Sequence, residues 1–280
     1  MIGGSPGITV GRVCARLDMT RQNYYKRRRR REIRQLQGEI VCGHVLEIRR
    51  DHPRMGVRKL RHLLRGKLLA HGMGVGRDRL FGVLRDNGML VAPYKSKFPK
   101  TTRHDPSLPC FANEIKGLAV VRPGQVLVAD ITYLMTAEGF CYLSLVMDLF
   151  SRKVVGFNVS ETLAVAGCIR SLKDALKSCP AGEGPIHHSD RGCQYASHEY
   201  VRVLRKAGCL ISMTQENHCY ENGAAERLNG ILKQEYGLDA TFADKGEASR
   251  RVARAVELYN NERPHSNLRM RTPAEVHQAA

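Results

Sequence analysis

The order of apolar and polar residues divides the chain into a helical first part and a second part in which strands and helices alternate. Up to about residue 95, apolar residues recur every three or four positions, the spacing of one helix face. From about residue 120, runs of β-branched and apolar residues alternate with such helical stretches. The pattern therefore predicts an all-helical segment followed by an α/β domain.

Two stretches of the helical part have the form helix, short turn, helix. In the first, residues 10–17 carry apolar positions at i, i+3 and i+7, and Thr20 can cap the helix that follows. In the second, residues 57–72 and 77–88 form the helices, with glycines in the turn between them and a glycine as the stop signal. Both are helix-turn-helix patterns of the kind that reads DNA.

The second part begins with three strands in a meander and then alternates helix and strand. The predicted strands are 124–134, two within 140–160, 185–190 and 209–214, and the predicted helices are 162–178, 196–207 and 224–238. This order predicts a mixed five-stranded sheet with helices on its faces.

The positive charge is concentrated in the helical part. Residues 1–112 contain 25 Lys and Arg against 8 Asp and Glu, a net charge of +17, whereas residues 113–280 contain 20 against 19, a net charge of +1. Clustered basic residues gain free energy by releasing counterions from phosphates, so we expect a DNA-binding module. A basic surface kept only for solubility is the alternative, but it would not need to stop at one boundary. The expected DNA contacts are Arg21, Arg27, Arg28, Arg58, Lys59, Arg77 and Arg79.

These patterns predict four parts: a helix-turn-helix with a basic helix (1–35), a second helix-turn-helix (36–95), a basic linker (96–112) and a core with a helical tail (113–280). The chain has neither an apolar run long enough for a membrane span nor the order of a signal peptide, so we expect a cytoplasmic protein without a membrane partner. The nine cysteines form no C-x-x-C pair and are expected to be reduced.

Three acidic residues lie on separate predicted elements of the core. Asp130 is inside the first strand, Asp190 ends the fourth strand, and Glu226 is on the last predicted helix. On that helix Asn222, Glu226, Asn229 and Lys233 form one polar stripe, which we expect to face the strand ends. Carboxylates without a basic neighbour favour Mg²⁺ or Mn²⁺ over zinc. Two such ions are suited to a phosphodiester displacement.

The acids and their surroundings resemble a known family. Five features are similar to the OrfB-type transposases of bacterial insertion sequences, the IS-three group. They are the DITY context of Asp130, the stretch HSDRGCQY, the 35 residues between Asp190 and Glu226, the stretch ENGAAERLNGILKQEY and the tail YNNERPHSNLRMRTPAEV. These are DDE recombinases with a retroviral-integrase-like, ribonuclease-H-type core, and the resemblance covers essentially the whole chain. One departure is Leu127, where the family usually has a tryptophan.

The resemblance implies a transposase that binds the terminal inverted repeats of its element, cleaves a 3′ end and uses the freed 3′-OH to attack a second phosphodiester. Asp130, Asp190 and Glu226 would be the catalytic residues and the ligands of two Mg²⁺ (or Mn²⁺) ions, and Asn222 and Lys233 would contact DNA. The implied partners are the element ends and target DNA, further copies of the chain on DNA, and an upstream-frame product of the element. A catalytically silent DNA-binding repressor and a structure-specific nuclease are the alternatives.

Overall fold

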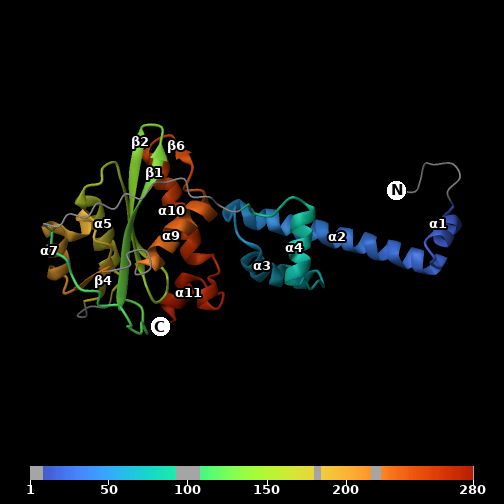
Figure 1. Cartoon of the computed structure of the whole chain (residues 1–280), viewed down its shortest axis with the longest axis horizontal. Coiled ribbons are helices and arrows are strands. Elements are labelled where there is room, and N and C mark those ends of the chain that lie inside the picture. The colour runs from blue at the N-terminus through green and yellow to red at the C-terminus, as the bar shows by residue number, and fades with distance from the viewer. Residues whose placement is uncertain (1–8, 93–107, 180–183, 216–221, 280) are drawn as a thin grey trace. The chain divides into compact units, whose positions relative to one another are not determined.

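The computed structural model describes residues 9–92, 108–179, 184–215 and 222–279 (Figure 1). The chain forms two compact units: a helical unit, Met1–Ile48 with Leu60–Leu90, and a core unit, Arg49–Lys59 with Val91–Ala280. Most of the expected linker 96–112 lies outside the described residues, as do His218 and Cys219. No helix in the described ranges combines the length and apolar character needed to cross a membrane.

Four helices occupy the first part of the chain: α1 (Val10–Arg16), α2 (Arg21–Asp51), α3 (Val57–Ala70) and α4 (Arg77–Asp86). They lie where the pattern predicts helices, and Thr20 caps α2 through its hydroxyl, which accepts from the backbone N–H of Asn23 at 3.2 Å. Helix α2 is continuous over 31 residues, so the expected boundary between residues 35 and 36 lies within it. Its many Arg, Gln and Glu residues are strong helix formers, and its two glycines do not interrupt it.

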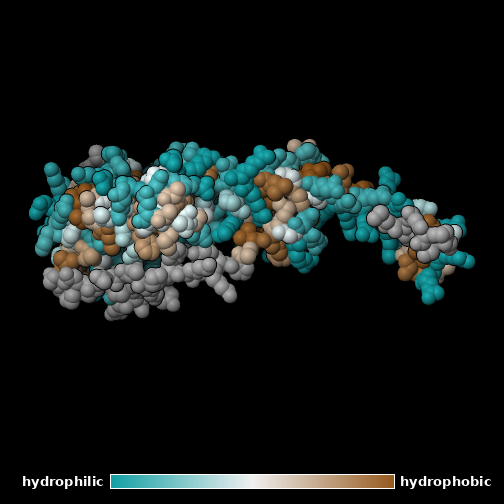
Figure 2. Space-filling view, turned by 90° about the horizontal axis from the view of Figure 1, so that it is seen from above, coloured by the Kyte–Doolittle hydropathy of each residue, from teal (hydrophilic) through white to brown (hydrophobic). Residues whose placement is uncertain are grey.

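The core of the helical unit is small and lies where α2, α3 and α4 meet. Its buried side chains are Val41, Val45, Leu60, Leu64, Leu68, Leu80 and Leu84. The first half of α2 contributes none of them and is exposed along residues 25–36. Several large apolar side chains also remain at the surface of this unit, and Figure 2 shows apolar patches over it. The basic half of α2 is therefore held by its own helical hydrogen bonds and caps, not by a core.

The core unit is built on one mixed sheet. Its strands, in the order β3-β2-β1-β4-β5, are β3 (Val154–Ser160), β2 (Gly139–Asp148), β1 (Val126–Thr136), β4 (Ile186–Ser189) and β5 (Leu210–Met213). The pairs β3–β2 and β2–β1 are antiparallel, whereas β1–β4 and β4–β5 are parallel. The five predicted strands are confirmed. A sixth, β6 (Thr241–Phe242), pairs parallel with β1 and was not predicted, because two residues are too few to show a period.

Helices cover both faces of this sheet (Figure 1). On one face lie α5 (Val165–Leu176), α6 (Cys193–Ala196) and α7 (His198–Lys206), and on the other lie α9 (Gly223–Tyr236), α10 (Lys245–Asn261) and α11 (Pro273–Gln278). Leu127 is buried in the first of these layers, beside Ile169 and Leu172 of α5, so the position of the family's tryptophan is filled by an aliphatic side chain. The mixed sheet with helices on both faces confirms the predicted ribonuclease-H-like core.

Close packing fixes α5 against the sheet at one glycine. A Cβ atom on Gly156 of β3 would lie 2.0 Å from the carbonyl oxygen of Ser171 in α5, far inside van der Waals contact. Only glycine allows this approach of helix and strand.

Candidate active site

The register of the sheet places Asp130 and Asp190 side by side. Strands β1 and β4 run parallel, with Val128 opposite His188. Asp130 and Asp190 each follow two residues later, so both lie beyond the same end of that pairing. Because side chains alternate along a strand, both also start from the same face, and neighbouring strands are ~4.8 Å apart. The sequence alone could not give this register.

Asp130 is a partly buried carboxylate held by two hydrogen bonds. The backbone N–H of Ile131 donates to Oδ1 at 2.9 Å, and Nδ2 of Asn229 donates to Oδ2 at 2.8 Å. Burial, together with the negative charges of Asp190 and Glu226, raises the pKa of Asp130 to about 7 against the lowering effect of these two hydrogen bonds. The three predicted acids therefore share one electrostatic neighbourhood.

Asp190 is positioned by the turn that follows β4. The backbone N–H of Gly192 donates to Oδ1 of Asp190 at 3.0 Å, and a Cβ atom at residue 192 would lie 2.9 Å from that oxygen. The side chain of Arg191 is directed elsewhere, since its Nε donates to the carbonyl oxygen of Thr214 at 2.7 Å. Glycine at position 192 thus leaves room for the carboxylate beside the chain.

Helix α9 brings its polar stripe to this edge of the sheet. Nδ2 of Asn222, at the helix N-cap, donates to the carbonyl oxygen of Ala129 at 3.2 Å. Asn229, about two helical turns later, contacts Asp130. The opposite side of the helix is buried through the predicted apolar face, Ala225, Leu228 and Leu232. Glu226 lies between the two asparagines in the first turn and is exposed.

Lys233 continues the stripe toward the C-terminal end of α9. Burial lowers the pKa of its ammonium, while the negative charges of Asp130 and Asp239 oppose that shift. The lysine therefore lies within the electrostatic reach of Asp130, on the side of α9 that faces the acids.

The donor set fits a divalent cation of the magnesium type. Carboxylate oxygens from β1, the end of β4 and α9 are hard ligands. The pKa of Asp130 is raised first by burial and then by the neighbouring acids, so a bound cation would stabilise its charged form. Within the described ranges, no three acidic, histidine or cysteine side chains already converge tightly enough to enclose an ion. Asp130 and Asp190 are held by hydrogen bonds, whereas Glu226 is exposed in the first turn of α9.

Most residues expected to contact DNA lie exposed on the first four helices. They are Arg21, Arg27 and Arg28 on α2, Arg58 on α3, and Arg77 and Arg79 on α4. Three of them also have ion-pair or hydrogen-bond partners: Arg28 binds Glu32 at 3.0 Å, Arg77 binds Asp78 at 2.8 Å and Arg79 binds Gln37 at 2.5 Å. Exposed pairs of this kind are weak and exchange readily with phosphate contacts.

Lys59 occupies a different environment. Its ammonium donates to Oε1 of Glu235 at 2.7 Å, and both side chains are mostly buried. The other partner of Glu235 is Arg263, which is 2% exposed and donates through Nε and Nη2 at 2.7 and 2.8 Å. Sequence reasoning missed this cluster, because Lys59, Glu235 and Arg263 are far apart in the chain and only the fold joins them.

The paired histidines of β4 are structural. His187 contacts the hydroxyl of Tyr200 at 2.9 Å, and burial lowers its pKa to about 3. His188 contacts the hydroxyl of Ser212 on β5 at 2.8 Å. Successive strand residues face opposite sides of the sheet, so the two rings cannot share one ion.

Residues 120–219 and 207–273 each match a family model described as an integrase core domain. A 31 kDa protein of insertion element IS600 of Shigella sonnei is 32% identical over 96% of this chain and 100% of its own length. The transposase of insertion sequence element IS629 of Shigella sonnei is 30% identical over 96% and 92%, and transposase InsF of IS3A of Escherichia coli K12 is 30% identical over 92% and 90%. The chain belongs to the IS3-type insertion-sequence transposases.

Membership of this family agrees with the mixed sheet and the flanking helices of the core unit. Among solved structures, the HTLV-2 integrase catalytic core domain in complex with magnesium covers 56% of this chain and 98% of its own, at 20% identity and a TM-score of 0.43. That likeness is too distant to carry further argument.

Proposed function

We propose that this transposase binds the terminal inverted repeats of its element, cleaves a phosphodiester at the element end and joins the freed 3′-OH to a second phosphodiester. The observation that carries the proposal is the parallel register of β1 and β4, with Asp130 and Asp190 adjacent at one edge and α9 bonded to the first of them. The IS3-type relatives, which match nearly the full chain, support the same reaction class.

We assign two roles to the residues of the site: some would hold the metal ions, and others would position the acids and the DNA strand. Asp130, Asp190 and Glu226 would hold two Mg²⁺ ions. Such ions supply activation of an attacking hydroxyl and stabilisation of the leaving oxygen. Asn229 keeps the Asp130 carboxylate oriented through its 2.8 Å hydrogen bond. Asn222 anchors the start of α9 to β1, which fixes Glu226 over the same edge. Lys233 supplies an ammonium for a phosphate of the strand being cut.

The basic helices would hold the DNA. Arg21, Arg27 and Arg28 lie on the exposed half of α2, and Arg77 and Arg79 lie in the first turn of α4, where helix-turn-helix proteins make many base contacts. Strand transfer requires two ends in one complex, so we expect a dimer or a larger assembly of the chain on DNA.

Substitution of the triad tests the proposal directly. Asp130→Asn, Asp190→Asn and Glu226→Gln should each lower cleavage of a labelled end duplex in Mg²⁺ roughly a hundredfold or more, since each removes a ligand charge worth several kcal/mol in the transition state. Affinity for the duplex, measured without divalent metal, should stay within about twofold. Asp174→Asn, which changes an exposed carboxylate on α5, is the matched control and should cleave normally.

The same assay separates the alternatives. Binding of the end duplex by the unsubstituted protein with no cleavage in Mg²⁺ or Mn²⁺ would identify a silent repressor. Nicking without any joined product would identify a nuclease. Retention of near-normal cleavage by one triad variant would remove that residue from the site.

A further inference from the structure

A pocket with both polar and apolar walls lies in the core unit, on another side of α9 from the acids. It has a volume of about 250 Å³ and is lined by residues of α9 together with residues of three other segments. Successive helix residues are turned by ~100°, so Leu228 and Ile231 in its wall lie on the side of α9 away from Glu226. The pocket is thus separate from the triad, and the triad's chemistry does not explain it.

Donors from three separate segments converge on this pocket. Arg152 comes from the turn between β2 and β3, Arg227 from α9, and His265 and Asn267 from the tail after α10. The first residues of α9, Gly223 and Ala224, complete the rim, where the helix carries partial positive charge. None of the residues that line the pocket in the described structure is acidic.

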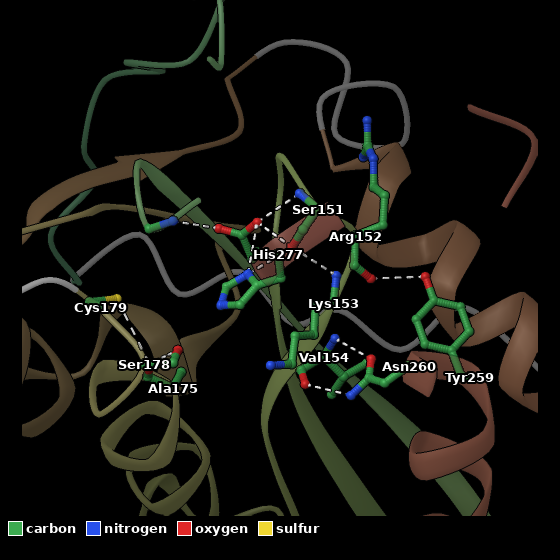
Figure 3. A network of polar contacts seen from close by, with 12 residues as sticks. Ser151, Arg152, Lys153, Val154, Ala175, Ser178, Cys179, Tyr259, Asn260 and His277 are labelled. Carbon is green, nitrogen blue, oxygen red and sulfur yellow. Dashed lines mark hydrogen bonds and ion pairs between the residues drawn. The ribbon is translucent and has the colours of Figure 1, made fainter. Parts of the chain in front are cut away.

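Arg152 is held in an unusual backbone conformation. Its φ of 64° is in the left-handed region, which a residue with a side chain adopts at a cost. Its N–H donates to the carbonyl oxygen of Asp148 at 2.9 Å, and its own carbonyl oxygen accepts from the hydroxyl of Tyr259 at 3.0 Å. Figure 3 shows its side chain extending away from that carbonyl oxygen. These contacts therefore fix the backbone of the turn from which the guanidinium extends.

The potential in the pocket is positive. Burial, together with the positive charges of Arg263, Arg152, Lys59 and Arg227, lowers the pKa of His265 to about 4. Burial also lowers the pKa of Arg152, against weaker effects of Tyr259 and Asp148. Nδ1 of His265 is a buried atom with no hydrogen-bond partner among the described residues. An anion would supply both the missing charge and an acceptor.

We propose that this pocket binds a phosphate group of the DNA backbone through Arg152, Arg227, His265 and Asn267. Four donors around a small cavity suit the oxygens of one phosphate, and arginine is the residue that binds phosphate with two parallel hydrogen bonds. The pocket and the triad share α9, so they are about one helix diameter apart, ~10 Å. The inference rests on the proposed function: the pocket would hold the DNA strand about one or two nucleotides from the phosphodiester at the acids.

The test compares two pocket variants of the full chain with a matched control. Arg227→Ala removes an exposed charge, and Arg152→Gly removes a charge while glycine favours the left-handed turn. Arg251→Ala, on the exposed side of α10, removes the same charge outside the pocket. Affinity for an end duplex is measured by fluorescence anisotropy in EDTA over a series of salt concentrations, and circular dichroism confirms folding.

We expect each pocket variant to raise Kd about tenfold, the effect of one lost charge-assisted hydrogen bond. The slope of log K against log salt should fall by about 0.9, the value for one phosphate contact. Arg251→Ala should change Kd less than about twofold. If both pocket variants match Arg251→Ala, the proposal is wrong. If Arg152→Gly fails to fold, Arg227→Ala decides alone.

Inorganic phosphate, added at constant ionic strength and followed by ³¹P line broadening, identifies the source of the anion. If Arg227→Ala loses phosphate binding but keeps wild-type affinity for DNA, the pocket serves a free anion and the DNA assignment is overturned. Failure here is distinguishable from failure of the proposed function. If the pocket variants bind DNA like the wild type while the triad still cleaves, only the pocket proposal fails. If the pocket variants lose affinity for DNA but the wild type never cleaves, only the proposed reaction fails.

Discussion

At the scale of single residues, the surroundings of Asp130 disfavour its charged form. Asp130 lies beside two further acids in a partly buried place, and its pKa of about 7 measures the resulting penalty on its charged form. Asn229 reduces this penalty with one hydrogen bond but does not remove it. Functional sites often keep such destabilised charges because the ligand relieves them.

The first prediction concerns stability against pH. An acid whose pKa is raised on folding contributes stability in full below the pKa of the unfolded chain, about 4, and loses it as the pH rises through about 7. In EDTA, Tm of the wild type should therefore fall from pH 5 to pH 8. Asp130→Asn should show a weaker fall and exceed the wild type at pH 8. If Tm of the wild type and of Asp130→Asn differed by the same amount at pH 5 and pH 8, ionisation of Asp130 would not be what destabilises the wild type.

At the scale of elements, α9 connects the active edge of the sheet with the interior of the core unit. One side of the helix carries Asn222, Glu226 and Asn229, and its C-terminal end carries Glu235, which binds Lys59 and Arg263. Burial opposes ionisation of Glu235, but the hydrogen bonds and charges of Arg263 and Lys59 hold its pKa below the usual range. The position of the helix therefore depends on a buried ionic cluster at one end.

Removal of this acid should destabilise the core unit strongly. Glu235→Ala leaves Arg263, 2% exposed, without its bidentate partner, and breaking such a buried pair costs about 3–5 kcal/mol. The measurement is the free energy of unfolding from urea denaturation. Glu257→Ala, which breaks an exposed pair with Arg254 on α10, is the control and should cost less than about 1 kcal/mol. Equal losses in the two variants would contradict a structural role for the cluster.

At the scale of the whole molecule, the basic residues and the three acids lie in different parts of the chain. The basic excess of residues 1–112 lies mainly on the first four helices, whereas residues 113–280 are near neutral and carry the acids. Binding and chemistry should therefore respond to different substitutions.

Arg27 and Arg31, one turn apart on the exposed half of α2, give a test of this division. The double variant Arg27→Ala/Arg31→Ala should weaken affinity for an end duplex and reduce the slope of log K against log salt by up to about 1.8, at ~0.9 for each lost phosphate contact. Cleavage at saturating protein should change little. Arg202→Ala/Arg205→Ala, on exposed positions of α7, is the control, and a slope change as large in this variant would place DNA binding elsewhere.

Much of the fold was readable from local pattern. The five strands β1 to β5, most of the helices and the polar stripe of α9 follow from periodicity, because side chains repeat every two residues in a strand and every 3.6 in a helix. The identity of the three acids followed from their spacing and from the family motif around them, since a motif is local in sequence. The basic character of the first part likewise required only the counts of Lys and Arg.

Only the tertiary structure determined what lies beside what. The register of β1 with β4 brings Asp130 next to Asp190, and the docking of α9 brings Asn229 to the same carboxylate. The burial of Lys59 against Glu235 and the pocket around Arg152 also join residues that are distant in the chain. Such contacts depend on strand order and helix packing, which are set by how the whole core is buried. A local sequence pattern does not contain that information.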